Sequence, residues 1–579
     1  MNNFSKTQAM KKNWSLVDLE EKKDKKTTNE KSAVDLILEK RGIRGEKEKQ
    51  KFLYPDYEND LSDPFSFSGM EKAVKIVLEK IKKKEKICIY GDYDADGVTA
   101  SVLLKDVFDK IGIENFCYIP DRNNEGYGIN KKAVDYIKKQ GANLAITVDC
   151  GISNMKEVEY AKEKKLDFII LDHHHLPIDL PSALAVVNPK LDADQNGTKE
   201  LAGVGVAFKF AQALLSRISK IDDDYCKWLL DLVCVGTIAD CVCLMGENRI
   251  LTKFGLIVLS KTKRVGLKQI FSVGRMNIDE NNLPTSHQIS FQLAPRINAA
   301  GRMDHANVAF ELLSKKETDQ ASARVLALEL ESHNQHRQKV TKKIIDEVEE
   351  KLAKKEKLPF VILESSPFWE MGVVGLAAGR IAEKYHRPTF LLQKGETTSR
   401  GSARSIPEFD LMLNMEKFRH LLEKYGGHCQ AAGMEIPNEK ILEFVSLMEK
   451  EAQKYFSVDA KKGVRVDAKI KAEDITNNLV KELDLLEPFG NGNPKPAFLV
   501  EDMEVVDKKM LGKSENHLKI WLKSKAVKGK LFEAIGFGFG KDYSKIKKGE
   551  KIDVVFNLER NNWNGSEGLQ MKIIDYEQK

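Results

Sequence analysis

Apolar runs of strand length alternate with amphipathic stretches of helical period between residues 70 and 190. Five of these runs have the length and composition of strands: KICIYG, NFCYIPD, LAITVDCG, DFIILDHH and LAVVNP. Repeated strand and helix units predict a parallel sheet with helices on both faces. Residues 200–300 have a mainly helical pattern, and we expect them to complete the same α/β domain.

The pattern changes again toward the C-terminus. Residues 306–355 contain neither glycine nor proline and carry charges at helical spacing, which predicts a long connecting helix. A second α/β pattern begins at LPFVILESS. Short alternating strands such as HLKIWLKS, with a hairpin signal at NNWNGSEG, then predict a small β-barrel. The expected divisions are a lysine- and glutamate-rich lead-in (1–68), the first α/β domain (69–305), the connecting helix (306–355), the second α/β domain (356–456) and the barrel (457–579).

Composition narrows the class of protein. The length of 579 residues suits three or four domains at about 150 residues each. A net charge of +6, from 93 basic and 87 acidic residues, does not by itself indicate a nucleic-acid binder, so any basic surface must be local. Eight cysteines without a C-x-x-C pair favour reduced thiols. The sequence lacks an apolar leader or a membrane-spanning stretch, which predicts a cytoplasmic protein that does not contact membranes. We expect a monomer.

The stretch GDYDADG places Asp92, Asp94 and Asp96 on alternate residues. Carboxylates this close repel one another unless a positive group lies among them. An EF-hand loop is excluded, because its twelfth position requires glutamate and here holds Leu103, and because a strand precedes this turn. A strand, an acidic turn and a helix instead form the mouth of an α/β sheet, where ligands bind.

Acidic and imidazole groups also follow two other strands and an apolar helix. They are Asp149 after LAITV, Asp172, His173, His174 and His175 after DFIIL, and Asp240 within VGTIADCVCL. A single aspartate at a strand end is usually a helix N-cap, and adjacent histidines are commonly surface residues. Such explanations would have to hold independently at four strand or helix ends, and their joint probability is small. Many carboxylate oxygens with one or two histidine nitrogens suit Mn²⁺ or Mg²⁺, and two such ions support phosphoryl transfer.

Several motifs resemble known families. GDYDADG, VDCG, DHHH and GTIADCVCL resemble, in this order, the signatures of the DHH phosphoesterase superfamily, and GGHCQAAG (426–433) resembles the signature of the DHHA1 domain. PDRNNEGYGIN, LAGVGVAFK, LAPRINAAGRM, GSARS and LEPFGNGNPKPAF resemble the RecJ family of bacterial 5′ exonucleases specific for single strands. The resemblance covers about residues 70–579. It implies an α/β fold in which a DHH parallel-sheet domain and a DHHA1 α/β domain are joined by a long helix and followed by an OB-like barrel.

The resemblance also implies roles for individual residues. The implied metal ligands are Asp94, Asp96, Asp149, His173 and Asp240, and Asp149 would bridge two ions. Asp92 and Asp172 would support these ligands, and Asp92 is also counted among the metal-binding residues. His174 would lie near the scissile phosphate and complete the catalytic set of Asp94, Asp96, Asp149, His173, His174 and Asp240. Arg122, Ser402 and Arg404 would hold a terminal 5′ phosphate, and Asn298, Arg302 and His428 would meet the strand backbone near the active site.

The implied activity is a 5′→3′ exonuclease that needs two Mn²⁺ or Mg²⁺ ions and releases 5′ mononucleotides from single-stranded DNA in repair and recombination. A helicase and a single-strand-binding protein are candidate partners. The barrel contains lysines and five aromatic residues that fit a base-stacking channel: Phe489, Phe498, Trp521, Phe537 and Trp563. We expect at least half of these aromatic residues to belong to the barrel core instead. GVVGLAAGR lacks the G-x-G-x-x-G pattern, so NAD is not predicted.

Two other functions are alternatives. A phosphodiesterase for short RNA or cyclic dinucleotides belongs to the same superfamily, but a dinucleotide needs neither this length nor a barrel. A catalytically inactive single-strand-binding scaffold is the alternative from another class. The complete set of carboxylates argues against the scaffold, because such proteins usually lose metal ligands.

Overall fold

The computed structural model of the protein describes residues 14–16, 32–194, 197–218, 221–222, 224–457, 463–563 and 566–579. Its first sheet is fully parallel, with strands in the order β3, β2, β4, β5, β6. The strands are β2 (Ile87–Gly91), β3 (Asn115–Tyr118), β4 (Leu144–Val148), β5 (Asp167–Leu171) and β6 (Ala185–Val187). They are the five apolar runs of the sequence, so the prediction of a parallel sheet is confirmed. The chain changes direction across the sheet between β2 and β4, and ligands bind at such a switch point.

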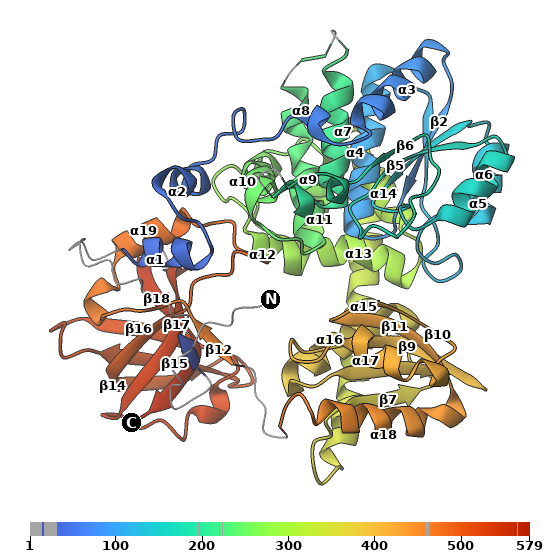
Figure 1. Ribbon diagram of the computed structural model, residues 1–579. Coiled ribbons are helices and arrows are strands. Elements are labelled where there is room, and N and C mark those ends of the chain that lie inside the picture. Colours follow the sequence, from blue (N-terminus) through green and yellow to red (C-terminus); the bar gives the residue numbers. More distant parts are fainter. Residues whose placement is uncertain are drawn as a thin grey trace. The chain divides into compact units, whose positions relative to one another are not determined.

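Helices cover both faces of this sheet, which explains why every residue of β2 and β4 is buried. α5 (Lys131–Lys139) and α6 (Met155–Glu163) share one apolar cluster with the sheet (Figure 1). α4 (Ala95–Ile111) contacts β2, β3 and β4 directly, and α7 (Gly203–Leu215) contacts β4 and β5. The other α-helices between residues 61 and 320 are α3 (Met70–Lys82), α8 (Tyr225–Trp228), α9 (Leu230–Ala239), α10 (Gly246–Ser260), α11 (Val265–Val273), α12 (Ser286–Gln288), α13 (Ala294–Met303) and α14 (Asn307–Leu313).

The connecting helix, predicted over residues 306–355, is α15 (Gln320–Ala353), which has 34 residues and is therefore about 51 Å long. It begins later than predicted, because residues 307–313 form the separate helix α14. A second sheet follows, in the order β10, β11, β9, β8, β7, and only β7 and β8 are parallel. Its strands are β7 (Ile362–Ser366), β8 (Thr389–Lys394), β9 (Thr398–Arg404), β10 (Lys424–His428) and β11 (Ala431–Pro437). The helices of this domain are α16 (Met371–Tyr385), α17 (Leu411–Lys417) and α18 (Ile441–Ala452).

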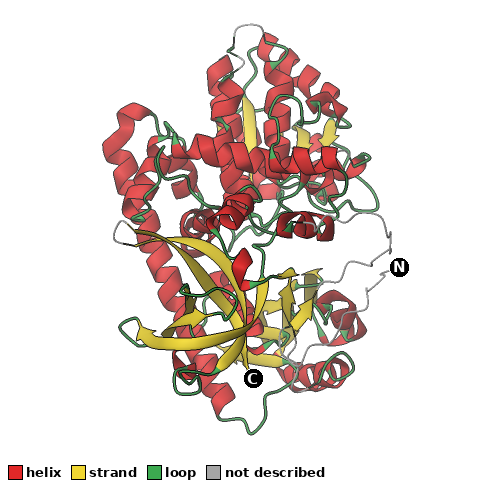
Figure 2. Ribbon diagram, turned by 90° about the vertical axis from the view of Figure 1, so that its left-hand side faces the viewer, coloured by secondary structure: helices red, strands yellow, loops and turns green. Residues whose placement is uncertain are grey.

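The C-terminal strands form the predicted barrel, drawn in yellow in Figure 2. Pairing of β14 with both β15 and β17 closes the sheet on itself. The barrel strands are β14 (Phe498–Leu511), β15 (His517–Lys523), β16 (Leu531–Gly536), β17 (Lys551–Trp563) and β18 (Ser566–Gln578). The other elements near the termini are β1 (Trp14–Leu16), α1 (Ala33–Lys40), α2 (Glu46–Leu53), β12 (Val464–Val466), β13 (Ala468–Lys469) and α19 (Asn477–Asp484). The predicted hairpin joins β17 to β18, and its turn at residues 564–565 lies outside the described residues.

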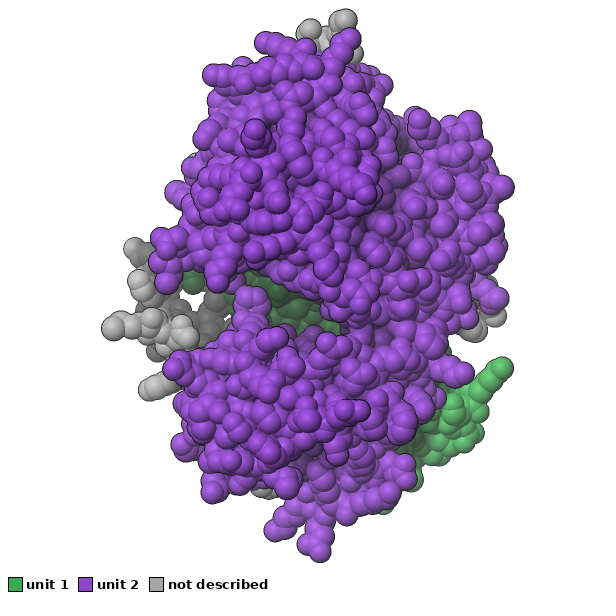
Figure 3. Space-filling view, turned by 90° about the vertical axis from the view of Figure 1, so that its right-hand side faces the viewer, with its two compact units in different colours: residues 1–60, 243–245, 462–579 green, residues 61–242, 246–461 purple. Residues whose placement is uncertain are grey.

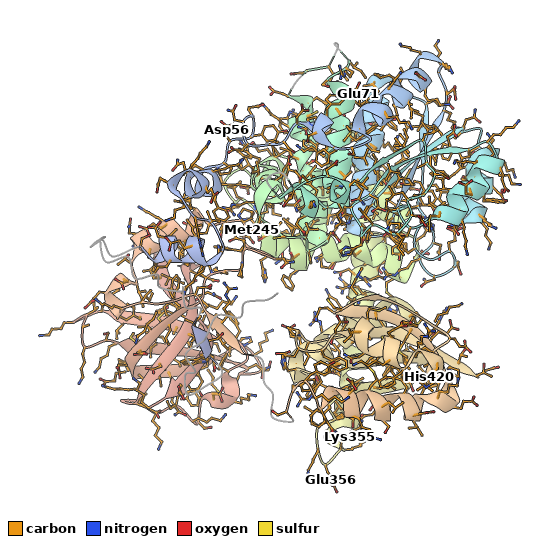
Figure 4. All side chains as sticks on the ribbon, in the orientation of Figure 1. Asp56, Glu71, Met245, Lys355, Glu356 and His420 are labelled. Atoms are coloured by element: carbon orange, nitrogen blue, oxygen red, sulfur yellow. The ribbon has the colours of Figure 1, made fainter. Side chains whose placement is uncertain are left out.

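The chain divides into two compact units, coloured separately in Figure 3. The barrel unit contains residues 1–60, 243–245 and 462–579, and the two-sheet unit contains residues 61–242 and 246–461. Helix α1 belongs to the barrel unit because Ile37 and Leu38 are buried in the barrel core. Met245, labelled in Figure 4, packs against the same core. No helix in the described part of the chain has both the length and the apolar character needed to cross a bilayer.

The barrel aromatics divide between core and surface. Phe498 is fully buried, and Phe489 packs partly buried against the same core. Trp521 is half-buried beneath Lys519, whose Nζ lies 5.0 Å from its ring centroid, whereas Phe537 is 52% exposed. The side chain of Trp563 lies outside the described residues. Phe537 and Trp521 therefore remain available for stacking, while Phe498 has a structural role.

Candidate metal centre and arginine-lined cavity

The turn between β2 and α4 is held in place by backbone amides. Asp94 is the N-cap of α4, and its Oδ1 accepts the N–H groups of Asp96 at 3.0 Å and Gly97 at 3.1 Å. Asp96 is buried, and its two oxygens accept the N–H groups of Gly203 at 2.7 Å and Val204 at 2.9 Å. These amides begin α7, where the helix dipole favours a negative charge. Two helix N-termini therefore orient the carboxylates.

The ends of β4 and β5 supply further acidic groups. Asp149 follows β4 with a side chain 2% exposed and a φ of +62°, a left-handed conformation that aspartate adopts more readily than most residues. Asp172 follows β5 and accepts the backbone N–H groups of Ile152, His173 and His174. Its Oδ1 also lies 2.8 Å from Nδ1 of His174. Asp172 therefore orients the histidine pair.

His173 joins acidic groups that come from separate elements. Its Nε2 lies 3.0 Å from Oδ1 of Asp149 and 3.6 Å from Oδ2 of Asp240, which is the C-cap of α9. Three sets of residues in this region each have possible ligand atoms within 4.8 Å of one another: Asp92, Asp94 and Asp149; Asp96, His173 and Asp240; and Asp149, His173 and His174. The structure therefore brings together all the residues that the sequence assigned to metal binding and catalysis, and we call them the acidic cluster.

Two glycines allow helices to approach the acidic cluster. A Cβ atom on Gly203 would lie 2.7 Å from Oδ1 of Asp149, and one on Gly236 would lie 2.7 Å from Oδ1 of Asp96. Both distances are far shorter than van der Waals contact. Any larger residue would push α7 or α9 away from the carboxylates, so the glycines set the close packing of the cluster.

Burial and mutual repulsion raise the pKa values of these carboxyl groups. The pKa of Asp149 lies well above its ordinary value because the group is buried and surrounded by the charges of Asp96 and Asp94. The same causes raise the pKa of Asp96 to about 7 and that of Asp240 to about 9. Burial, together with the charge of the neighbouring His174, lowers the pKa of His173 to about 3, which keeps its imidazole neutral at pH 7. Neutral imidazole is the form that binds metal.

The cluster has unsatisfied polar atoms of the kind that a cation would bind. Oδ1 of Asp92, Oδ1 of Asp149 and Nε2 of His173 are buried, and none of them has a hydrogen-bond partner among the described residues. Buried polar atoms are normally paired, and leaving one unpaired is costly. A divalent cation would satisfy all three atoms and reverse the repulsion that raises the pKa values. The donor set of carboxylates and one or two imidazoles therefore fits Mn²⁺ or Mg²⁺.

The raised pKa values predict how stability of the metal-free protein depends on pH. Between pH 7 and pH 9 the folded state holds protons on groups such as Asp240 that an unfolded chain has already released, so stability falls as pH rises. We expect the melting temperature of chelator-treated protein to fall over this range, and Mn²⁺ to remove most of the slope. Asp240→Asn should flatten the metal-free profile. A metal-free profile identical in the wild type and this variant would contradict the prediction.

Two residues that the sequence did not single out also contact the histidine pair. The hydroxyl of Tyr127 lies 3.1 Å from Nδ1 of His174 and donates to the carbonyl of Asp149 at 3.3 Å. Lys190 donates from Nζ to the carbonyl of His173, and its charge lowers the pKa of Asp240 against the stronger effects of burial and neighbouring aspartates. Tyr127 falls within PDRNNEGYGIN, so that motif contained the signal. Lys190 comes directly after the predicted strand LAVVNP, and no motif in the sequence pointed to it.

A cavity of about 240 Å³ contains the three residues assigned to a terminal phosphate, with Arg302. It is lined by Arg122, Asn123, Arg302, Met371, Gly372, Val374, Gly375, Arg400, Gly401, Ser402 and Arg404. The guanidinium of Arg122 lies 4.8 Å from the ring centroid of Tyr93, within the GDYDADG turn. This cation–π contact links the cavity to the acidic cluster.

No acidic side chain in the described part of the chain lies within salt-bridge distance of the cavity arginines. Burial and the charge of Arg122 lower the pKa of Arg302 to about 9, and the same two causes lower the pKa of Arg404. Arg404 donates from Nη1 to Oγ of Ser402 at 2.7 Å, and Arg302 donates to the carbonyl of Gly372 at 3.2 Å. Repelling guanidinium groups held by neutral acceptors fit an anion, and planar guanidinium matches phosphate oxygens.

The other two residues assigned to the strand lie beside the acidic cluster. Oδ1 of Asn298 accepts the N–H of Ala95 at 2.7 Å, so this side chain supports the turn that carries the aspartates. The ring of His428 lies 5.5 Å from that of His175, and both rings are exposed. The second sheet therefore places its histidine next to the DHHH motif.

Three known domain families match this chain. They are described as the DHH family, N-terminal domain (residues 86–237), the DHHA1 domain (357–454) and the RecJ OB domain (466–575). The single-stranded-DNA-specific exonuclease RecJ of Bacillus subtilis (strain 168) is 37% identical, covering 98% of this chain and 71% of that protein. The protein of the same name from Haemophilus influenzae is 31% identical, covering 94% of this chain and 95% of that protein. The chain belongs to the RecJ family.

Solved structures agree with this assignment. The crystal structure of RecJ from Thermus thermophilus in complex with Mn²⁺ has a TM-score of 0.80 and 28% identity, covering 94% of this chain and 76% of that chain. The corresponding complex with Mg²⁺ has a TM-score of 0.73 and 27% identity, covering 94% and 74%. The predicted fold class is therefore confirmed, and relatives bind the ions that the donor set predicts.

Proposed function

We propose that this protein is a metal-dependent exonuclease that degrades single-stranded DNA from its 5′ end and releases 5′ mononucleotides. The observation that carries the proposal is the pairing of the acidic cluster with the arginine-lined cavity, linked by the contact between Tyr93 and Arg122. One site has the donors for two divalent ions, and the other has the donors for a phosphate. The names of the RecJ relatives support the choice of single-stranded DNA as the substrate.

We assign the ion-binding residues from the ligand sets of the acidic cluster. Asp96, His173 and Asp240 would hold one ion, Asp92 and Asp94 would serve the other, and Asp149 would be shared between them. Bound there, a pair of divalent ions supplies positive charge for activating water and for stabilising the phosphodiester oxygens. The amides of α7 that hold Asp96 keep its carboxylate in one orientation before any ion binds.

His174, which follows the proposed ligand His173, has a separate role in this proposal. Hydrogen bonding to Asp172 raises the pKa of His174 against the opposing effect of burial. His174 therefore keeps a proton over a wider pH range, with Nδ1 held by Asp172 and the other ring nitrogen able to donate to a phosphate oxygen. Its role is to bind and orient the scissile phosphate.

The cavity accounts for the size of the product. If Arg122, Ser402 and Arg404 hold a terminal 5′ phosphate, the first phosphodiester bond lies one nucleotide farther along the strand. Anchoring at the end thus fixes the position of cleavage, and each cycle releases one mononucleotide. We propose that Arg302 and His428 contact the strand backbone between the cavity and the acidic cluster, and that Asn298 acts through the turn it supports.

We also propose a biological setting for this activity. Removing single strands from a 5′ end serves DNA repair and recombination, and we place the protein in the cytoplasm as a monomer. A helicase that supplies single strands and a single-strand-binding protein that covers them are the candidate partners.

Incubation of purified protein with Mn²⁺ and single-stranded oligonucleotides labelled at either end tests the activity. We expect immediate release of labelled mononucleotide from the 5′ end, a gradually shortening 3′-labelled strand and an intact duplex control. Release from the 3′ end would overturn the polarity. A bound but uncut strand would favour the inactive scaffold, and hydrolysis of dinucleotides alone would favour the small-substrate phosphodiesterase.

A further inference from the structure

We propose that Phe291 is a stacking platform for one nucleobase of the bound strand, a few nucleotides from its 5′ end. The inference rests on the proposed function and adds to it a binding residue that lies outside the acidic cluster and the cavity. It starts from an apolar side chain at an unusual place. Phe291 is 68% exposed, on the helical segment that leads directly into α13.

The ring of Phe291 is held in place on one side. The ring of His287, one turn earlier, stacks on it with centroids 4.5 Å apart and an interplanar angle of 29°. Stacking aligns the phenyl ring before any ligand binds, and the exposure of Phe291 shows that much of its surface stays accessible. An ordered, accessible aromatic face is what single-strand-binding proteins offer to bases, because every base has a π face.

The backbone at Phe291 also departs from regular helix. Residues Ile289–Leu293 form a π-helical turn between α12 and α13 (Figure 1). Such turns are rare, and they occur frequently at functional sites. Ile289 and Leu293 at its two ends are fully buried, so the core anchors this turn while Phe291 between them faces outward.

Phe291 shares a helix face with two residues of the proposed site. Asn298 and Arg302 follow it by seven and eleven residues, intervals that return to nearly the same side of a regular α-helix, and the π-helical turn offsets Phe291 from that side by only a fraction of a turn. At a rise of about 1.5 Å per residue, Phe291 lies about 16 Å along the axis from Arg302 in the cavity. A stacked strand advances about 3.4 Å per nucleotide, so this distance corresponds to at most about five nucleotides, and to fewer in an extended strand.

The chemistry of this helix face suits a nucleic-acid strand. Arg302 at one end belongs to a cluster of guanidinium groups that fits phosphate, and Phe291 at the other end offers an apolar ring. A single strand has the same division, with charged phosphates along one edge and flat bases on the other. A strand whose phosphates run from Arg302 toward the acidic cluster would leave a later base free to cover Phe291.

Equilibrium binding to oligonucleotides with single abasic sites tests the inference. The background is Asp149→Asn, so that the strand is not consumed, and binding is measured by anisotropy with a phosphorylated strand carrying an abasic site at each of the first eight positions. We expect Phe291→Ala to weaken binding of the intact strand on the order of 5- to 100-fold, the range for loss of one base–aromatic stack. One abasic position, between the second and the sixth, should weaken the parent similarly and add nothing in Phe291→Ala.

Two further variants sharpen the test. Phe291→Trp should retain affinity, and its added fluorescence, measured against the parent with its five tryptophans, should be quenched by the intact strand but not by the critical abasic strand. Leu442→Ala removes another exposed apolar residue, 80% exposed on α18, and should bind every strand like the parent. Unchanged binding in Phe291→Ala, or an equal loss at every abasic position, would overturn the inference and would favour a protein partner or a structural role. Absence of hydrolysis by the wild-type protein would instead refute the proposed function.

Discussion

Asp149→Asn is expected to abolish hydrolysis while leaving the affinity for single-stranded DNA nearly unchanged. Removing one charge-stabilising donor from an active site typically costs about 10²–10³-fold in rate, and a ligand shared by two ions should cost at least on the order of 10³-fold. Asparagine keeps the shape of the side chain and tolerates the left-handed backbone at this position. The measurement is single-turnover release of 5′-labelled mononucleotide with Mn²⁺, beside anisotropy binding in chelator.

A matched control uses another aspartate of the same sheet. Asp167 is the first residue of β5, at the end of the strand away from the acidic cluster. Asp167→Asn therefore removes an equal charge far from the cluster and should leave turnover unchanged. Asp149→Asn should also raise the melting temperature of metal-free protein, because it removes a buried carboxylate whose pKa is raised by its neighbours. Normal turnover in Asp149→Asn would refute the assignment of the shared ligand.

Arg404→Ala is expected to remove the preference for strands that carry a 5′ phosphate. Hydrogen bonds to charged groups contribute about 1.5–3 kcal/mol, so KM for a 5′-phosphorylated strand should rise on the order of 10- to 100-fold. A strand with a 5′ hydroxyl has no terminal phosphate to lose, and its KM should change far less. Competition between the two strands, each with its own fluorescent label, measures the ratio directly.

Two variants control for charge and for general destabilisation. Arg404→Lys keeps the positive charge but loses the planar fork, so it should recover only part of the preference. Arg419→Ala removes an exposed arginine that pairs with Glu416 at 3.2 Å, outside the cavity, and should behave like the wild-type protein. If Arg404→Ala weakened both strands equally, the cavity would not be the site of the terminal phosphate.

The acidic cluster could be anticipated from the sequence because strand ends of a parallel sheet converge. Once β2, β4 and β5 were identified as apolar runs, Asp96, Asp149 and Asp172 had to lie along one edge of the sheet. The structure places them there, with Asp172 directed at the histidines. Their close approach also depends on the strand order, because β2, β4 and β5 are neighbours in the sheet.

Other features of the site depended on contacts between distant segments. The support that Asn298 gives to Ala95, and the position of Lys190 beneath His173, join residues that no periodic pattern relates. The exposure of the Phe291 ring could not be predicted either, because the sequence shows only one apolar residue shortly before LAPRINAAGRM. Side-chain direction at such positions is set by helix packing and not by local propensity.

The sequence by itself determined the elements, the acidic edge of the first sheet and the family resemblance, because each depends on local periodicity or on short motifs. Only the tertiary structure decided that α1 completes the barrel core, far along the chain from β13 and α19, and that Arg122, Arg302 and Arg404 share one cavity. A helix with one apolar face shows that it needs a partner but does not show which one. That choice is made by the shape of the whole core, where distant surfaces exclude water together.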